Sequence, residues 1–324
     1  MDQKSLKIQY YSSVTSQDVD WLWYPYIPYG RITVIQGDPG EGKTTFVLQI
    51  AARLSTGQPL PECDQAISPQ NVIYQSTEDG IADTVKPRLI AAGADCTRIA
   101  FIDDAEYPLT LNDERLERAI SKCEARLLVL DPLQAFIGAD SDMHRANEMR
   151  PLLHKLAGIA ECNRCAVVII GHMNKATGSK GLYRSLGSID ITAAARSVLL
   201  IGRLKDEPTI RVMTHLKSNL APEGRSVAFE MVPEGGIRWI GYYDVTADDL
   251  LSGSNPSDES KLLQARTLLR EALSEKPMPC AEAYALCKRY GIGERSADTA
   301  KRMEDIKSVK MPGGWYWVLR SGSV

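Results

Sequence analysis

Residues 31–54 read RITVIQGDPGEGKTTFVLQIAARL, an apolar strand pattern followed by a glycine-rich loop and an amphipathic helix pattern. The loop fits the spacing G-x-x-x-x-G-K-[ST] in the strand and helix context that such loops require. Its glycines let backbone N–H groups turn inward around phosphate oxygens, and the helix N-terminus adds a partial positive charge. The stretch therefore predicts an α/β fold that binds nucleotide phosphates. The residues expected to contact the nucleotide are Gly37, Asp38, Pro39, Gly40, Glu41, Gly42, Lys43, Thr44 and Thr45.

Two of these side chains and one later carboxylate predict a site for ATP and Mg²⁺. Lys43 is expected to reach the β and γ phosphates, and the hydroxyl of Thr44 is expected to bind Mg²⁺. Residues 127–131 read LLVLD, an apolar strand that delivers the carboxylate of Asp131 to the Mg²⁺ site.

The residue that activates the attacking water must lie elsewhere, because Pro132 rather than a glutamate follows Asp131. The strand pattern at 71–75 runs into Ser76-Thr77-Glu78-Asp79, at the edge where parallel sheets bind ligands. Glu78 is the candidate to orient or deprotonate the water. The same residues also fit the first turn of a helix, with Thr77 as its cap, and a role for Asp79 stays open.

The rest of the chain predicts a mostly parallel sheet with helices on both faces. Apolar or β-branched runs lie at 32–36, 71–75, 99–102, 127–130, 166–170, 196–201, 209–214 and 226–231. Helical spacing occupies 44–54, 81–92, 113–124 and 147–161. From about residue 194 strands follow one another directly, which predicts an antiparallel extension of the sheet. The aromatic residues at 21–29 are interpreted as residues of the core or of a subunit interface, and adenine stacking is the alternative.

Composition excludes several classes of protein. The chain has 324 residues, 44% of them hydrophobic, 24% charged, and a mean hydropathy of -0.21. No apolar run approaches the roughly 18 residues of a membrane span, and the N-terminus lacks the apolar stretch of a secretory signal. Seven cysteines are interpreted as reduced thiols. We expect a cytoplasmic protein without a membrane partner.

Charge and linker composition divide the chain. Residues 258–324 carry 12 Lys and Arg against 9 Asp and Glu, whereas the preceding part has a net charge of -6. Residues 246–260 are rich in Ser, Gly, Asp and Asn without periodicity. We predict an ATPase domain at 1–250, a linker at 251–260 and a small domain at 261–324.

The small domain predicts a winged helix. Three helical stretches, at 262–273, 280–290 and 294–303, precede VKMPGGWYWVL, which predicts two strands around a Pro-Gly-Gly turn. Arg295, Lys301 and Arg302 on the third helix are expected to face phosphate. A protein-docking role stays open, because the positive surplus is small.

The order of these parts resembles the RecA-type ATPase core, and more closely the RepA-type hexameric replicative helicases of plasmids and phages, together with AAA-type ATPases of mobile elements. The stretches that carry the likeness are WLWYPYIPYGRITVIQGDPGEGKTT, VIYQSTEDG, LLVLDPLQAFIGADSD, VVIIGHMNKATGSKGLYRSLGSIDITAAARSVLLI and THLKSNLAP, between about residues 20 and 241. The resemblance implies a homo-oligomeric ring, expected to be a hexamer, that hydrolyses ATP and acts on DNA as a helicase. It also implies that His172, in IIGHMNK, contacts the γ-phosphate. A polar group at the end of a central strand could register that phosphate, although a buried structural histidine fits as well.

The loop after His172 contains no acidic residue. Residues 173–188 read MNKATGSKGLYRSLGS and carry Lys175, Lys180 and Arg184 in an otherwise acidic body. We expect these three cations to hold single-stranded DNA. An ordinary solvated loop is the alternative.

The resemblance also implies a cation supplied to the neighbouring subunit. Arg196, in TAAARSVLL, occupies the position of an arginine finger that acts in trans. Lys217 lies where related helicases have a Lys-x-Arg pair, but Asn219 replaces that arginine. Arg196 is therefore the expected finger and Lys217 a supporting cation, unless both are ordinary charges at the edge of the sheet.

Two other functions stay open. An ATP-switched DNA-binding regulator or partition factor would use the same loop without unwinding DNA. A recombinase-like filament former would need an N-terminal polymerisation segment, for which the first 20 residues look too short.

Overall fold

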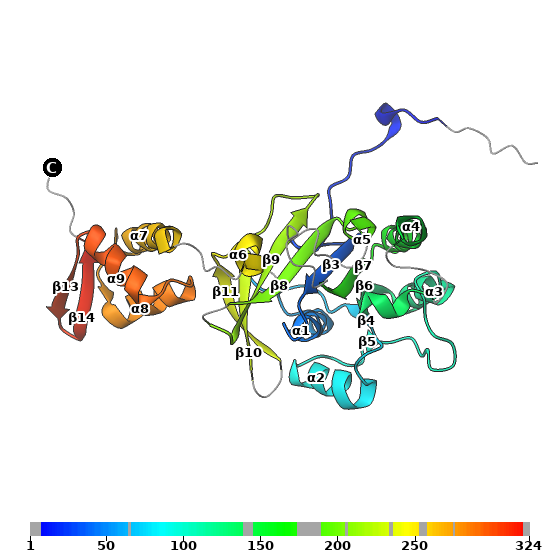
Figure 1. Cartoon of the computed structure of the whole chain (residues 1–324), viewed down its shortest axis with the longest axis horizontal. Coiled ribbons are helices and arrows are strands. Elements are labelled where there is room, and N and C mark those ends of the chain that lie inside the picture. The colour runs from blue at the N-terminus through cyan, green and yellow to red at the C-terminus, as the bar shows by residue number, and fades with distance from the viewer. Residues whose placement is uncertain are drawn as a thin grey trace, which may run out of the picture.

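The structure, a computed structural model, describes residues 8–63, 66–138, 145–173, 189–204, 207–232, 236–252, 258–274 and 276–319. Its centre is a nine-stranded sheet in the order β11-β10-β9-β8-β3-β7-β6-β4-β5 (Figure 1). The strands, in chain order, are β3 Ile32–Gly37, β4 Asn71–Ser76, β5 Ile99–Ala100, β6 Ala125–Asp131, β7 Ala166–His172, β8 Ser197–Arg203, β9 Ile210–Ser218, β10 Ser226–Met231 and β11 Ile237–Tyr243.

The sheet has a parallel and an antiparallel part. Strands β3 to β8 pair in parallel, with β3 between β7 and β8, whereas β9, β10 and β11 continue the sheet in antiparallel fashion. This confirms the predicted fold class and the predicted antiparallel extension. Because the carboxyl ends of parallel strands meet at one edge, the segments after β3, β4, β6 and β7 all begin there.

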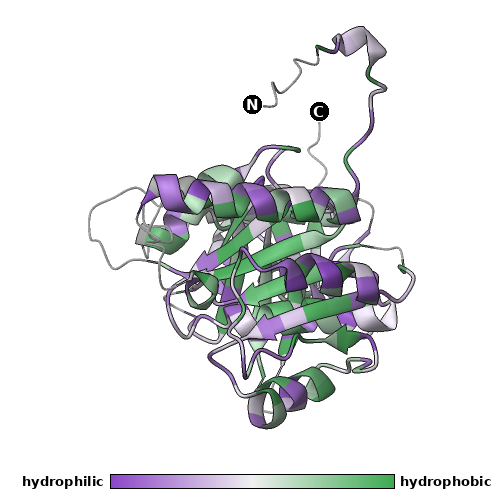
Figure 2. Ribbon diagram, turned by 90° about the vertical axis from the view of Figure 1, so that its right-hand side faces the viewer, coloured by the Kyte–Doolittle hydropathy of each residue, from purple (hydrophilic) through white to green (hydrophobic). Residues whose placement is uncertain are grey.

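Helices cover both faces of the parallel part (Figure 1). The bounds are α1 Lys43–Thr56, the π-helix η2 Ile81–Val85, α2 Lys86–Ala91, α3 Glu114–Cys123, the 3₁₀ turn η3 Leu133–Phe136, α4 Ala146–Asn163, α5 Ile189–Ala194 and α6 Ala247–Ser252. Successive residues of β6 point to opposite faces of the sheet. Leu127 and Val129 pack on the side of α1, and Leu128 and Leu130 pack on the side of α3 and α4. Figure 2 shows these apolar strands between helices whose outer surfaces are more polar.

The predicted helix at 81–92 differs in form from the observed one. It starts as a π-helix, Ile81–Val85, and becomes α-helical only from Lys86. Pro87 has no N–H to donate, which would interrupt a continuous α-helix in its middle. The change of helix type places Pro87 in the first turn of α2, where that donor is not needed.

In the part of the chain before residue 250, two strand regions escaped the sequence prediction. The hairpin β1 Trp21–Trp23 with β2 Ile27–Pro28 is very short. Strand β11 carries a bulge, because Ala228 pairs with Gly241 and the next residue, Phe229, pairs with Trp239. The bulge breaks the period-two pattern by which a strand is found in a sequence.

Two of the aromatic residues before the phosphate-binding loop, Trp23 and Tyr26, pack in the core, whereas Tyr24 is 58% exposed. Trp23 and Tyr26 are each 1% exposed. Their ring centroids lie 4.5 Å apart, and Trp23 also contacts Phe46 of α1 and Trp239 of β11. This cluster joins α1 to the antiparallel part of the sheet.

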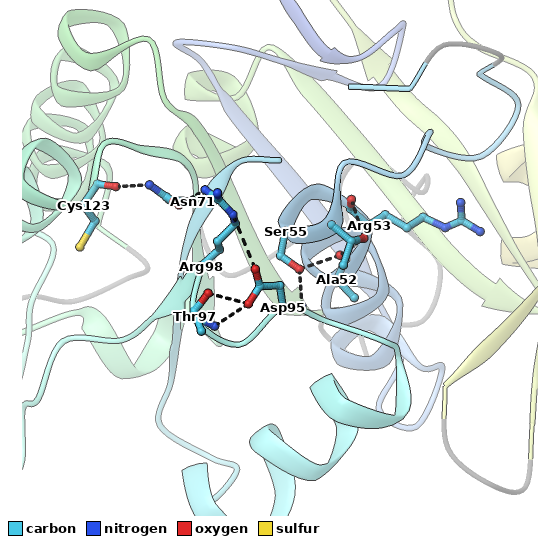
Figure 3. A network of polar contacts seen from close by, with 9 residues as sticks. Ala52, Arg53, Ser55, Asn71, Asp95, Thr97, Arg98 and Cys123 are labelled. Atoms are coloured by element: carbon cyan, nitrogen blue, oxygen red, sulfur yellow. Dashed lines mark hydrogen bonds and ion pairs between the residues drawn. The ribbon is translucent and has the colours of Figure 1, made fainter. Parts of the chain in front are cut away.

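A polar network joins the C-terminal half of α1 to the segment that precedes β5, the last strand in the order of the large sheet (Figure 3). The hydroxyl of Ser55 donates to the carbonyl of Ala52 and accepts from the N–H of Asp95 at 2.9 Å. The carboxylate of Asp95 accepts two bonds from Thr97. These contacts fix the segment between α2 and β5.

The C-terminal elements have a core of their own. They are α7 Asp258–Ser274, β12 Met278–Pro279, α8 Cys280–Arg289, α9 Glu294–Met303, β13 Ile306–Met311 and β14 Gly314–Leu319. The strands form a sheet in the order β12-β14-β13, and Trp317 of β14, 1% exposed, packs among the helices. Because α6 runs to Ser252 and α7 starts at Asp258, helices occupy both ends of the predicted linker.

Within the described part of the chain, no helix combines the length and apolar character that crossing a bilayer requires.

Candidate functional site

The phosphate-binding loop joins β3 to α1, and its shape depends on two glycines. Gly42 caps α1 with a left-handed φ of 83°, a conformation that side chains with a Cβ seldom adopt. A Cβ on Gly37 would lie 2.2 Å from the carbonyl oxygen of Ile201 in β8. The loop therefore sits tightly against the neighbouring strand, with the N-terminus of α1 directed at it.

Lys43 is the first residue of α1, directly after the loop, and is 4% exposed. Its ammonium donates to the carbonyls of Gly37 at 2.9 Å and Asp38 at 2.8 Å. Burial lowers the pKa of Lys43, while the carboxylates of Asp131 and Glu41 oppose that effect. An ammonium has three donors, so one remains for a phosphate oxygen.

Thr44 and Asp131, the two residues predicted to bind Mg²⁺, lie in contact. The Thr44 hydroxyl donates to Oδ2 of Asp131 at 2.8 Å, and the Tyr74 hydroxyl donates to the same oxygen at 2.7 Å. Burial raises the pKa of Asp131, while the bonds from Tyr74 and Thr44 act in the opposite direction. A hydroxyl and a carboxylate are the oxygen donors that Mg²⁺ prefers. The pair therefore fits that ion.

The local sequence pattern did not predict a site role for Tyr74. It lies on β4, which pairs with β6 so that Ser76 is opposite Asp131. The pleat puts Tyr74 and Ser76 on one face of the strand. That alternation was the available signal, but the pairing of β4 with β6 was needed to use it.

Glu78 and His172 come together across the carboxyl edge of the sheet. Oε2 of Glu78 lies 3.8 Å from Nε2 of His172, although Glu78 follows β4 and His172 ends β7, and these strands are separated by β6. The N–H of Thr77 donates to the carbonyl of Asp131, which holds the turn that carries Glu78 beside β6. Nδ1 of His172 is buried and has no hydrogen-bond partner in the described structure.

Asp79 points to a different partner. Its carboxylate accepts from Arg88 of α2 at 2.7 Å, and its N–H donates to the Ser76 hydroxyl. The side chain of Glu78 is 64% exposed, whereas that of Asp79 is 32% exposed. Of these two carboxylates, Glu78 is therefore the one that is more open to a water molecule.

Arg196 and Lys217 lie at the opposite edge of the sheet. The N–H of Arg196 donates to the carbonyl of Ile32, where β3 begins, so the phosphate-binding loop is about 17 Å away along that strand. Lys217 donates to the carbonyls of Thr192, Ala193 and Ala195 at 2.7 to 3.3 Å. Within one subunit neither cation can reach that loop.

Two arginines at the loop edge were not singled out from the sequence. Arg203 ends β8 and Arg211 lies at the start of β9, and both contact Glu41 of the loop. Their position at the ends of strands was the available signal. Lys175, Lys180 and Arg184, predicted to bind DNA, lie outside the described residues.

The predicted basic face of α9 is partly occupied by internal contacts. Lys301 donates to the Ser308 hydroxyl at 2.7 Å and lies 4.9 Å from the ring centre of Trp317. Arg302 is exposed and bonds within its own helix. The side chain of Arg295 lies outside the described part of the structure.

Residues 5–178 match the family model described as an AAA domain. DNA repair protein RadA of Halalkalibacterium halodurans is 26% identical over 230 residues, which cover 69% of this chain and 44% of that protein. RadA of Bacillus subtilis is 23% identical over 227 residues, which cover 69% of this chain and 44% of that protein. The chain thus spans about half the length of the curated relatives it matches.

Solved structures with a partial likeness include a KaiC-like protein of Pyrococcus horikoshii, at 19% identity and a TM-score of 0.49, covering 65% of this chain and 90% of that one. The RadB recombinase has 19% identity and a TM-score of 0.46, covering 65% and 91%.

Proposed function

The chain belongs to the AAA domain family, and from this premise we propose that it hydrolyses ATP with Mg²⁺ at the edge of the sheet where β3, β4, β6 and β7 end. One observation carries the proposal: Thr44, Asp131, Glu78 and His172 come from four separate segments and meet at this edge. Lys43 and the loop N–H groups would hold the phosphates. The relationship to RadA proteins supports an ATPase of the RecA type.

Each side chain at this edge has a separate role in the proposed reaction. Thr44 and Asp131 would hold Mg²⁺, which when bound neutralises charge on the phosphate oxygens. Glu78 orients or deprotonates the attacking water, since its carboxylate is exposed and lies beside His172. His172, 3.8 Å from Glu78, is suited to link the state of the nucleotide to the segment that follows it.

A ring is the second part of the proposal. Arg196 directly precedes β8, at the edge away from its own phosphate-binding loop, and its side chain is exposed. We expect it to complete the nucleotide site of the next subunit in a homo-oligomeric ring, expected to be a hexamer. In such a ring Lys175, Lys180 and Arg184 would hold single-stranded DNA, and the motor would act as a DNA helicase in replication of a plasmid, phage or integrated element.

An unwinding assay tests this proposal. The full chain with ATP and Mg²⁺ should separate a forked duplex, and single-stranded DNA should stimulate hydrolysis. Mass measurement with nucleotide should give one closed ring size. Hydrolysis and DNA binding without unwinding would reject the helicase and favour the ATP-switched regulator.

DNA repair is a second candidate, because the curated relatives that match 69% of the chain are named DNA repair proteins. An ATP-dependent strand-exchange assay separates it from replication. Strand exchange without unwinding of the fork would favour repair.

The C-terminal elements are proposed to form a winged helix at 261–324, joined to an ATPase domain at 1–250. Their separate core supports this division. Trp315, 57% exposed, lies directly across the β13–β14 hairpin from Lys310. The lysine suits the phosphates of duplex DNA, and the exposed tryptophan suits the surface of a replication protein.

Deleting residues 258–324 tests the division. The remaining chain should stay folded and hydrolyse ATP, whereas duplex DNA binding or partner recruitment should fall. The point variant Trp315→Ala should reproduce the binding defect without the deletion. An inactive core would show that the boundary is wrong.

A further inference from the structure

Glu41, in the middle of the phosphate-binding loop, contacts two arginines of the β8–β9 ribbon. Its Oε1 lies 3.3 Å from Nη2 of Arg203, and its Oε2 lies 3.3 Å from Nε of Arg211. The side chains of Glu41 and Arg211 are 12% and 9% exposed, and that of Arg203 is 43% exposed. The carboxylate is thus enclosed between one buried and one half-buried cation.

The carboxylate of Glu41 offsets the repulsion between the two arginines. Arg203 and Arg211 are direct cross-strand partners in the antiparallel pair of β8 and β9, and like charges directly opposite one another destabilise a sheet. Burial and the charge of Arg203 lower the pKa of Arg211, and Glu41 opposes both. With Glu41 the three charges sum to one positive charge. Without it two cations would face each other beside the loop.

The contact of Glu41 is one of several that seat the loop on the ribbon and on β10. A Cβ on Gly42 would lie 2.9 Å from Sδ of Met231, at the end of β10. Oε2 of Glu41 and Nε of Arg211 face each other without hydrogen-bond geometry, so charge rather than a fixed bond holds this side of the loop. The charge of Glu41 is therefore one of the contacts that hold the loop against the β8–β9 ribbon.

We propose that Glu41 is a positioning residue that fixes the phosphate-binding loop to the β8–β9 ribbon through Arg203 and Arg211, and so sets the affinity of the loop for nucleotide phosphates. The inference rests on the proposed binding of ATP at this loop. It assigns Glu41 no contact with the reacting atoms. Its effect should therefore appear in nucleotide binding before the chemical step.

The test measures dissociation constants of Mg²⁺-ATP and Mg²⁺-ADP, together with kcat and KM, for the full chain. Glu41→Gln keeps the shape and removes the charge, which leaves Arg211 unpaired. We expect both dissociation constants and KM to rise about tenfold, with kcat changed less than about twofold. Glu161→Gln is the matched control, because Glu161 pairs with Arg31 at the other end of β3.

Two further variants keep the test decisive if Glu41→Gln lowers thermal stability. Arg203→Ala removes the half-exposed partner of Glu41 and should raise the dissociation constants of both nucleotides about threefold. Exchanging the charges, with Glu41→Arg and Arg211→Glu together, should recover most of the affinity lost in Glu41→Gln. Wild-type affinity in Glu41→Gln and Arg203→Ala would overturn the inference. A wild-type chain that binds no ATP would overturn the proposed function instead.

Discussion

The carboxyl edge of the parallel strands and the opposite edge of the large sheet each have a lysine and a histidine, and the two pairs make different contacts. At the carboxyl edge, Lys43 has one donor left, and Nδ1 of His172 has no hydrogen-bond partner in the described structure. At the other edge, Lys217 donates to three carbonyls. Near that edge His215, 4% exposed, accepts from the Gly224 N–H at 2.9 Å and lies 3.3 Å from the Ser197 hydroxyl.

Side chains whose hydrogen-bonding groups all have partners within the protein therefore stabilise the fold, whereas side chains with an unused donor or acceptor can contact a ligand. Lys217 satisfies carbonyls at the end of α5, which is the ordinary role of a cation at a helix C-terminus. Arg196 makes no side-chain hydrogen bond or ion pair in the described structure, so it stays the better finger of the two. The same residue types thus have different tasks at the two edges.

The largest effect is expected at the carboxyl edge. Lys43→Ala should abolish nucleotide binding or turnover, because its ammonium meets phosphate in the ground state. Glu78→Gln should keep nucleotide binding and lower kcat by about 10²-fold or more, because Glu78 acts on the water. Binding by calorimetry and turnover by phosphate release separate the two. Normal turnover of Glu78→Gln would show that another residue, with Asp79 as the first candidate, activates the water.

Mixing inactive subunits tests whether the two edges meet between neighbours. Subunits with Glu78→Gln, combined with subunits carrying Arg196→Ala, should regain activity, because some interfaces in a mixed ring have both groups intact. A finger contributes about 10³-fold or more in rate, so even a minority of repaired interfaces is measurable. Flat activity at every mixing ratio, in rings shown by mass to be mixed, would reject a trans role for Arg196.

A pH dependence of stability is expected from His215. Burial lowers the pKa of His215 from 6.5 to about 4, so between these values the unfolded chain binds a proton that the native protein does not. The contribution of the neutral His215 ring to the free energy of unfolding is fully present above pH 6.5, and it decreases as the pH falls toward 4. Between pH 7 and pH 5 the wild type should lose about 2 kcal/mol more than His215→Gln. Denaturant unfolding at several pH values measures this, and His154→Gln, at an exposed site, should behave like the wild type.

The smallest effect is expected from Lys217. Lys217→Met removes the donors to the end of α5 and should lower the free energy of unfolding by about 1 kcal/mol. Turnover per folded subunit should change little. A loss of turnover by orders of magnitude at unchanged stability would instead assign Lys217 to the neighbour's nucleotide site.

Local patterns in the sequence were enough for much of the fold. Residues 31–54 alone predicted a strand, a phosphate-binding loop and a helix, and the observed β3 and α1 follow within two residues. The alternation of strands and helices predicted the parallel sheet, since that pattern requires crossovers. The bulged β11 and the π-helix at Ile81–Val85 escaped, because each departs from the regular periodicity on which prediction depends.

The sequence by itself determined which chemical groups the protein has at the ends of its strands: a phosphate-binding loop, Asp131, Glu78 and His172. The tertiary structure decided which of them meet, because strand order is set by long-range pairing that no local pattern encodes. Only the insertion of β6 and β7 between β4 and β3 brings Tyr74 to Asp131 and Glu78 to His172. Only the pairing of β8 with β9 puts Arg203 opposite Arg211, where two like charges require the carboxylate of Glu41.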